Sequence, residues 1–337
     1  MMKNIPIYYL LFSFFLFSCD TDFSANADWE ETMVIYGLID QTDDRQYIKI
    51  NKAYLGEGDA LQMASISDSV NYNPLDLNVI LFKIKSNGDI QDSVILKDTI
   101  MNKDPGLFST DNNIIYTFKN SGFLEQNKTY RLHVKNVASG TTCVSETRLI
   151  EEINVEDYWN VAPNYKFNFF YNQEYADATI TWDKSNNGVV YQMILTFNYV
   201  RISNSSVLDT ISVDWVYPII YQQGNSAIVQ QINGEEFFNF LSNNSTIEND
   251  YNLNNNLNRR ALSLDLEITA GTEDLYTYMV LNSPSLGIIQ QKPFFTNIDN
   301  GIGLFSSRYK WKQANLPIHS STIEKISMDL ESFNFIQ

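Results

Sequence analysis

The feature of this sequence that most constrains its fold is an alternation of apolar and polar side chains with a period of two. From residue 262 to residue 269, leucine or isoleucine stands at every even position and a polar residue at every odd one. Successive side chains of a β-strand point to opposite faces of the sheet, so this pattern is typical of a half-buried strand. Leu262, Leu264, Leu266 and Ile268 are therefore expected to face a core together.

The same alternation recurs along most of the chain, so the sequence predicts a mainly β protein. Further strands are expected at residues 33–39, 47–54, 79–84, 93–97, 114–118, 128–137, 142–148, 178–182, 191–199 and 207–217. The Asn-Gly pairs at 87–88 and 187–188 are typical of tight hairpin turns.

Helix signals are few. Residues 234–241 and 272–281 each place acidic side chains in what would be the first helical turn, where the helix dipole favours them. The asparagine-rich stretch 243–258 is predicted to be a solvated loop.

The spacing of the expected strands divides the chain into two parts. Residues 28–150 are predicted to form an immunoglobulin-like β-sandwich, because short strands follow one another with polar turns between them. The stretch from Leu124 to Tyr130 looks like the turn into a late strand of such a sandwich. Residues 151–337 are predicted to form a second β-rich domain, fibronectin-III-like, with two short helices and a core tryptophan at Trp182.

The N-terminus has the layout of an export signal. Lys3 precedes an almost wholly apolar run at residues 5–17, which is shorter than the roughly 20 residues of a membrane-spanning helix. The run ends at Ser18-Cys19, which resembles a bacterial lipobox. We therefore predict a lipoprotein signal peptide at residues 1–18, lipid attachment (diacylglycerol and palmitate) at Cys19, and an acidic tether at residues 19–27. The alternative is an ordinary secretory signal with an incidental cysteine.

Composition limits the chemistry that is open to the chain. A formal net charge of −17 argues against binding to nucleic acid and against electrostatic attraction to anionic lipid, so membrane contact is expected through the lipid anchor only. Cys143 is the only cysteine besides Cys19, and it is predicted to be a buried small hydrophobe. The only histidines are His133 and His319.

One stretch offers a candidate ligand-binding surface. Tyr165, Phe167, Phe169 and Tyr171 alternate with other residues and would share one face of a strand. Aromatic faces provide a large rigid contact area, so this run could bind a glycan or a peptide. The alternative is that the same face is buried in the core of the second domain.

Other candidate sites are weak. Asp40, Asp43 and Asp44 could hold Ca²⁺, but the spaced acids, central glycine and terminal glutamate of an EF-hand are absent, and a solvated acidic turn is the alternative. Asn300 to Gly303 lacks the features of a phosphate loop, and its glycines indicate close backbone approach. The sequence predicts no catalytic residues, no metal and no cofactor.

Three segments resemble an uncharacterised family of Bacteroidota lipoproteins. They are the glycine-containing strand at 33–39, the strand entry at 124–134, and the closing segment at 296–305 with its pattern NI-x-x-G-x-G-x-F. Members are commonly encoded beside TonB-dependent outer-membrane receptors, and the resemblance implies no enzymatic activity and no family site residues. The acids behind Cys19 also resemble the surface-export signal of such lipoproteins.

This resemblance implies a non-enzymatic lipoprotein of the outer membrane and cell surface, an accessory of a TonB-dependent uptake system whose partner is the receptor. The alternative function is a direct glycan- or peptide-binding module that uses the aromatic run.

Overall fold

The computed structural model describes residues 31–53, 60–104, 106, 109, 112–156, 165–283 and 294–337. The predicted signal peptide, Cys19 and the tether lie outside these residues. The protein is mainly β, with several sheets and few short helices, which confirms the predicted fold class.

The N-terminal part is a sandwich of two antiparallel sheets. Four strands lie in one sheet in the order β1, β2, β6 and β5, which are Met33–Asp40, Arg45–Lys52, Ile114–Lys119 and Lys97–Ile100. Four lie in the other in the order β4, β3, β7 and β8, which are Ile90–Ile95, Leu77–Ile84, Thr129–Asn136 and Thr142–Arg148. This distribution of eight successive strands is the immunoglobulin arrangement.

Tyr130 confirms this assignment at the level of one side chain. It lies at the start of β7, where the chain crosses from one sheet to the other. Its hydroxyl donates to the carbonyl oxygen of Phe123 and accepts from the backbone N–H of Glu125, both at 2.8 Å. Such a tyrosine corner is a hallmark of immunoglobulin-like sandwiches.

The C-terminal part has the strand order of a fibronectin type III domain. One sheet contains β11 (Ala178–Trp182) and β15 (Ile228–Ile232), joined by a bridge from Val155 to Trp182. The other runs in the order β13, β12, β16 and β17, which are Ser206–Val216, Val190–Ser203, Asn258–Gly271 and Gly301–Leu316. Trp182 is fully buried between the sheets. A short strand, β14 (Ile220–Tyr221), pairs with β12.

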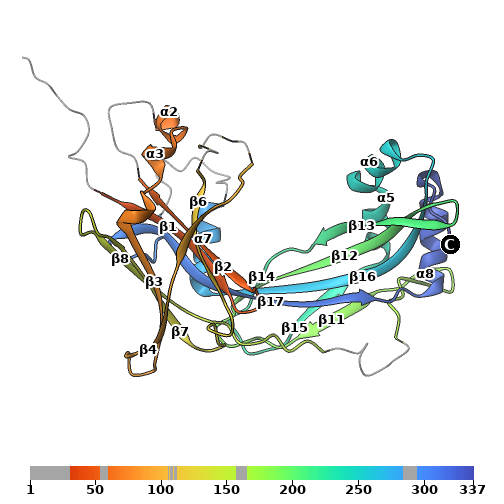
Figure 1. The fold of residues 1–337 in the computed structure, drawn as a ribbon. Helices are drawn as coiled ribbons and strands as arrows, with labels where there is room; N and C mark the ends of the chain where they lie inside the picture. The colour runs from red at the N-terminus through yellow and green to blue at the C-terminus, as the bar shows by residue number, and fades with distance from the viewer. Residues whose placement is uncertain are drawn as a thin grey trace, which may run out of the picture.

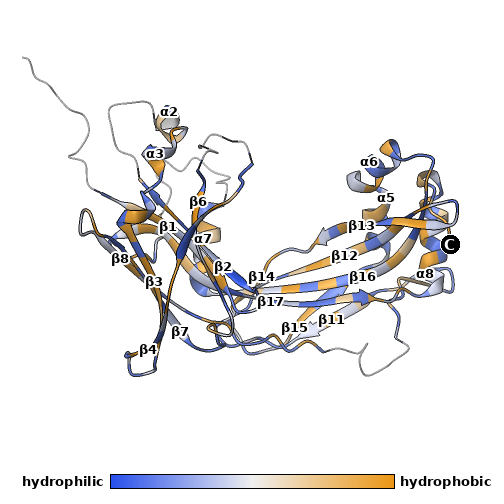
Figure 2. Ribbon diagram, in the orientation of Figure 1, coloured by the Kyte–Doolittle hydropathy of each residue, from blue (hydrophilic) through white to orange (hydrophobic). Residues whose placement is uncertain are grey.

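The two sheets of this second sandwich differ greatly in length, and other segments cover the difference. β16 has 14 residues and β17 has 16, whereas β11 and β15 have five each. The short sheet leaves part of the apolar face of the long sheet bare. Helices cover this part, together with the small hairpin of β9 (Phe170–Tyr171) and β10 (Glu174–Tyr175) and the C-terminal Phe335. The long strands alternate in hydropathy as predicted (Figure 2).

The predicted alternation in β16 fails at one residue. Leu264, Leu266 and Ile268 face the core, but Leu262 is 46% exposed. Irregularities in the pairing of β16 with both neighbours lie between residues 261 and 266. A β-bulge inserts one extra residue into a strand, so the residues on its N-terminal side, such as Leu262, point to the opposite face of the sheet.

The two Asn-Gly pairs have different roles. The pair at 187–188 connects strands of different sheets and is not a hairpin turn, whereas the pair at 87–88 joins the paired strands β3 and β4.

Helices are more numerous than the two that the sequence predicts. The expected ones are α5 (Gly234–Ser242) and α7 (Glu273–Asn282), and two more are α6 (Ser245–Leu253) and α8 (Ser320–Asp329). The predicted loop 243–258 contains α6, because Asn244 caps it by accepting from the backbone N–H groups of Thr246 and Ile247. The short helices α2 (Ala60–Ala64) and α3 (Ser67–Val70) lie over the first sandwich. Among the described residues, no helix is both long enough and apolar enough to cross a membrane.

One strand belongs to both sandwiches. From Arg308 to Leu316, β17 pairs with β16 of the second sandwich, and from Gly301 to Arg308 it pairs in parallel with β1 of the first. The two sheets therefore merge into one nine-stranded sheet, and β17 runs continuously between the sandwiches in Figure 1. Along the chain, Leu149 belongs to the hydrophobic core of the first sandwich and Ile150 to that of the second. Ile298 and Phe305, much later in the sequence, belong to the first core again. The first half of β17 thus packs with the first sandwich.

Two glycines permit this parallel pairing. A Cβ added to Gly303 would lie 2.0 Å from the carbonyl oxygen of Ile35, and one on Gly301 would lie 2.9 Å from that of Met33. Gly303 also has a φ of +122°, which disfavours any other residue. The expected close backbone approach at this segment is confirmed.

Gly303→Ala should therefore destabilise the protein by about 3 kcal/mol, because it adds both a clash and backbone strain. Chemical denaturation of the purified variant measures this loss. Gly140→Ala is the matched control, since Gly140 has a φ of +83° but no atom within 4 Å of an added Cβ. It should lose only about 1 kcal/mol, and equal losses in the two variants would contradict this account of β17.

Candidate functional site

The aromatic run is not a ligand-binding surface in this structure. Phe167 and Phe169 are fully buried, and the ring of Phe169 lies 4.4 Å, centroid to centroid, from that of Phe237 on α5. Tyr165 packs on the same core, and only Tyr171 is largely exposed. The prediction of a shared aromatic platform is corrected, because the long sheet of the second sandwich needs these rings to cover its apolar face.

In the acidic turn at the end of β1, Asp40 and Asp43 form ion pairs, whereas Asp44 is exposed. Asp40 is fully buried and accepts from the guanidinium of Arg308 at 3.2 Å, and Asp43 accepts from Lys310 at 2.7 Å. Both cations lie on β17 where that strand passes from one sandwich to the other. Among the described residues there is no group of three or more metal-ligating side chains. The turn therefore ties the shared strand to the first sandwich.

His319 caps a helix. Its Nδ1 accepts from the backbone N–H of Ser321 at the start of α8, and the Ser321 hydroxyl contacts the same nitrogen at 2.8 Å. That hydroxyl also donates to the carbonyl oxygen of Phe170. The hydrogen bonds of His319 and Ser321 therefore hold α8 against the hairpin of β9 and β10.

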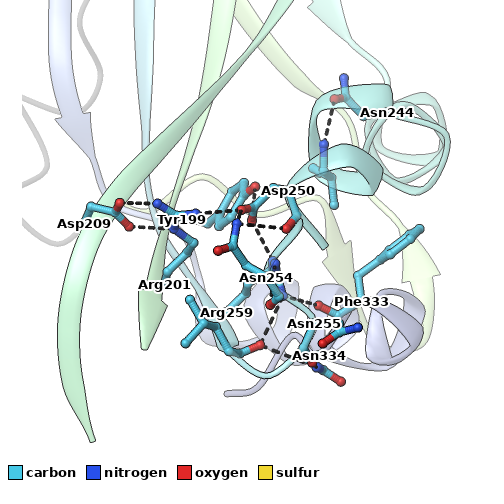
Figure 3. Close-up of polar contacts among 12 residues, drawn as sticks. Tyr199, Arg201, Asp209, Asn244, Asp250, Asn254, Asn255, Arg259, Phe333 and Asn334 are labelled. Carbon is cyan, nitrogen blue, oxygen red and sulfur yellow. Dashed lines mark hydrogen bonds and ion pairs between the residues drawn. The ribbon is translucent and has the colours of Figure 1, made fainter. Parts of the chain in front are cut away.

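The most conspicuous polar cluster is buried at the far end of the second sandwich (Figure 3). Asp250 of α6 accepts from Arg259 at 2.7 Å, from Arg201 at 3.1 Å and from the hydroxyl of Tyr199 at 2.9 Å. Burial alone would raise the pKa of Asp250, but hydrogen bonds from Arg259 and Tyr199 outweigh it and hold the pKa below its ordinary value.

Every guanidinium nitrogen of Arg259 has an acceptor inside the protein. Besides Asp250, these are the carbonyl oxygens of Asn254, Leu257 and Phe333. The cluster therefore joins α6, two strands and the C-terminal segment. We interpret it as structural.

Asp250→Asn should lower the free energy of unfolding by about 3–5 kcal/mol, because it leaves the guanidinium of Arg259 buried without a counter-charge. Asp209→Asn is a matched control, since Asp209 pairs with the same Arg201 from an exposed position on β13. It should cost less than about 1 kcal/mol. Thermal and urea unfolding of both variants measure the difference, and a mild effect at Asp250 would refute the structural role.

The strongest candidate for a binding site is a pocket on the outer face of the first sandwich. It has a volume of about 530 Å³, within the range of ligand pockets. Its floor is formed by outward side chains of β1, β2 and β6, and one wall by the end of α3. The described lining is Val34, Tyr36, Lys49, Asn51, Lys52, Val70, Asn71, Lys103, Ser109, Asn113 and Ile115.

The strand register brings these side chains together. Tyr36 of β1 lies opposite Lys49 of β2, and Val34 lies opposite Asn51. Their chain neighbours Ile35, Ile48 and Ile50 point inward to the first core. The site is thus the outer face of a sheet whose inner face is fully packed.

Lys49 is the central polar residue of this pocket. Its ammonium group donates to the carbonyl oxygen of Ile114 at 2.8 Å and to the side-chain oxygens of Asn113 at 2.9 Å and Asn71 at 3.3 Å. All three acceptors are neutral. Burial, together with the positive charge of Lys103, lowers the pKa of Lys49 to about 8. A lysine perturbed in this way within a pocket is a functional-site candidate.

The second sandwich contributes to the rim of the pocket. Tyr278 of α7 contacts the hydroxyl of Tyr36 at 3.3 Å, and the two rings meet edge to face. The helix lies beside β1 and β2 in Figure 1. Burial and this contact raise the pKa of Tyr36 to about 12, so its hydroxyl stays neutral.

The sequence alone does not predict this pocket. Its only signal in the sequence is that the strand expected at 47–54 places Lys49 and Asn51 on its outward face. Polar residues at such positions are equally typical of a face that is simply exposed to solvent. The pairing of β1 with β2 and the return of the chain at β6 were needed to assemble the site.

The lowered pKa of Lys49 predicts a pH dependence of stability. Unfolded Lys49 keeps its proton up to its ordinary pKa of 10.5, whereas folded Lys49 releases it near 8. The unfolded state binds more protons between these values, so the contribution of Lys49 to stability rises with pH across that window. Over that range, the unfolding free energy of the wild type should rise relative to that of Lys49→Met.

The control for this measurement is Lys97→Met, at an exposed position on β5 of the same sheet. It should keep the pH dependence of the wild type. Parallel curves for the wild type and Lys49→Met would show that Lys49 is not perturbed.

Comparison with known proteins adds no family to this picture. No protein-family model matches the sequence, and no curated protein matches it.

Proposed function

We propose that this protein is a non-enzymatic, lipid-anchored protein of the outer membrane and cell surface that binds a ligand as an accessory of a TonB-dependent uptake system. The observation that carries the proposal is the apolar run at residues 5–17 that ends at Ser18-Cys19, followed by an acidic stretch and then by β-sandwiches. Three acyl chains on a cysteine anchor a protein stably, since each buried CH₂ contributes about 0.8 kcal/mol.

The architecture supports a role in binding. Two β-sandwiches joined by one continuous strand form an extended body, and the pocket around Lys49 lies on its first sandwich. The described lining of that pocket combines apolar side chains with lysines and amides, and it contains no carboxylate, histidine or cysteine. A lining that offers apolar contact together with a few convergent polar groups suits the holding of a ligand.

Cys19→Ala tests the anchor. The wild type should fractionate with the outer membrane and incorporate labelled palmitate, whereas the variant should lose the label and appear in the soluble fraction. Cys143→Ala is the control, because Cys143 is buried, and its thiol donates to the carbonyl oxygen of Asn300 at 3.0 Å. It should keep both the label and the membrane fractionation. A Cys19→Ala protein that remains labelled would overturn the assignment.

The receptor partnership has a separate test. The native protein, solubilised from outer membranes in mild detergent, should co-purify with a TonB-dependent receptor identified by mass spectrometry. Cys19→Ala should reduce this recovery, because it removes the protein from the membrane plane. Recovery of the native protein without any such receptor would contradict the partnership and leave the anchor intact.

A further inference from the structure

The pocket around Lys49 is a cationic patch in an acidic protein. The chain has a net charge of −17, yet the described lining contains Lys49, Lys52 and Lys103 and no acidic side chain. Such a local reversal of charge within a concave, partly apolar surface raises the local concentration of anions.

The second feature of the pocket is how the charge of Lys49 is balanced. Its ammonium group is half-buried and satisfied by amide and carbonyl oxygens only, so its hydrogen bonds are complete while its charge has no counter-charge among those partners. The positive charge of Lys103 acts on it unfavourably. An anion placed between the two lysines would relieve both the repulsion and the cost of burial.

Most of the surface that the pocket exposes is nevertheless apolar. Val34, Ile115 and the ring of Tyr36 lie on the floor and Val70 on the wall. A hydrated inorganic anion would leave these surfaces in contact with water, whereas an apolar group would bury them at a gain of roughly 25 cal/mol per Å². The lining therefore fits a molecule with two chemically different ends.

We propose that this pocket binds an organic anion with an apolar body, with the anionic head beside Lys49 and Lys103 and the body against Val34, Val70 and Ile115. This inference deepens the proposed binding role, and it depends on neither the lipid anchor nor the receptor.

Neighbouring acids fix the orientation of the head group. Lys52 donates to the carbonyl oxygen of Asp68 and also lines an adjacent cavity that contains Asp68 and Asp98. An anion is repelled from that side, so the head belongs at Lys49 and Lys103.

The experiment compares two probes that share one ring system. 8-Anilinonaphthalene-1-sulfonate carries an anionic head, and N-phenyl-1-naphthylamine is the same body without it. The full chain carrying Cys19→Ala is used, so that no detergent competes for the probes. We expect saturable one-to-one binding of the sulfonate that weakens with added salt, and much weaker binding of the neutral amine.

Lys49→Met should weaken the sulfonate about tenfold, since it removes a charge from the head-group site, and it should leave the neutral amine unchanged. Lys97→Met, on the same sheet but outside the pocket, should bind both probes like the parent. If Lys49→Met fails to fold, Lys103→Met and the salt dependence of the parent decide the question.

Displacement of the sulfonate identifies the class of head group. Dodecanoate and dodecyl phosphate distinguish a carboxylate from a phosphate, and dodecanol lacks a charge. Displacement by either anion and not by dodecanol supports the proposal. Equal affinity for the charged and neutral probes, or equal effects of Lys49→Met and Lys97→Met, would overturn it, while membrane fractionation and receptor recovery would stay as they are.

Discussion

The parallel pairing of β1 with the first half of β17 is the interaction on which the rest of the structure depends. It makes one strand the edge of two sandwiches and joins their sheets. The backbones approach so closely that Gly301 and Gly303 have no room for a side chain. Where the strand changes partners, Arg308 and Lys310 bind Asp40 and Asp43. The cations on β17 are thereby paired with carboxylates of the first sandwich, so slippage of the register at this point would leave Asp40 buried without a counter-charge.

A long shared strand creates a second requirement, since β12, β16 and β17 extend well beyond the short sheet that faces them. An apolar sheet face must be covered, and the chain covers it with α5, α8, the aromatic run and Phe335. The buried cluster of Asp250, Arg259 and Arg201 then fixes α6 and the C-terminal segment to the end of the same sheet. Side chains that resembled a binding surface in the sequence thus serve the core of the second sandwich.

The same merged sheet positions the candidate binding site. The inner face of β1 and β2 packs in the first core, which leaves Lys49, Asn51 and Tyr36 outward under α3. The segment between β16 and β17 carries α7, which brings Tyr278 to the rim. A ligand in this pocket would therefore contact one sandwich directly and touch the second through a single tyrosine pair, which gives the two halves of the protein a common surface.

The sequence by itself determined the elements that obey a local rule. Period-two alternation located most strands, and Tyr130, Trp182 and the closing glycines pointed to the right sandwiches and to a close backbone approach, because these signals depend on neighbours within a few residues. Tertiary structure alone decided that Leu262, which precedes the bulge in β16, points outward. It also decided that Phe167 and Phe169 lie inside and that Asp40 is paired with a cation. It also decided that Lys49 lies in a pocket. Each of these depends on contacts between residues far apart in the chain, and the partner of Asp40 stands 268 positions away, a separation at which no local pattern carries information.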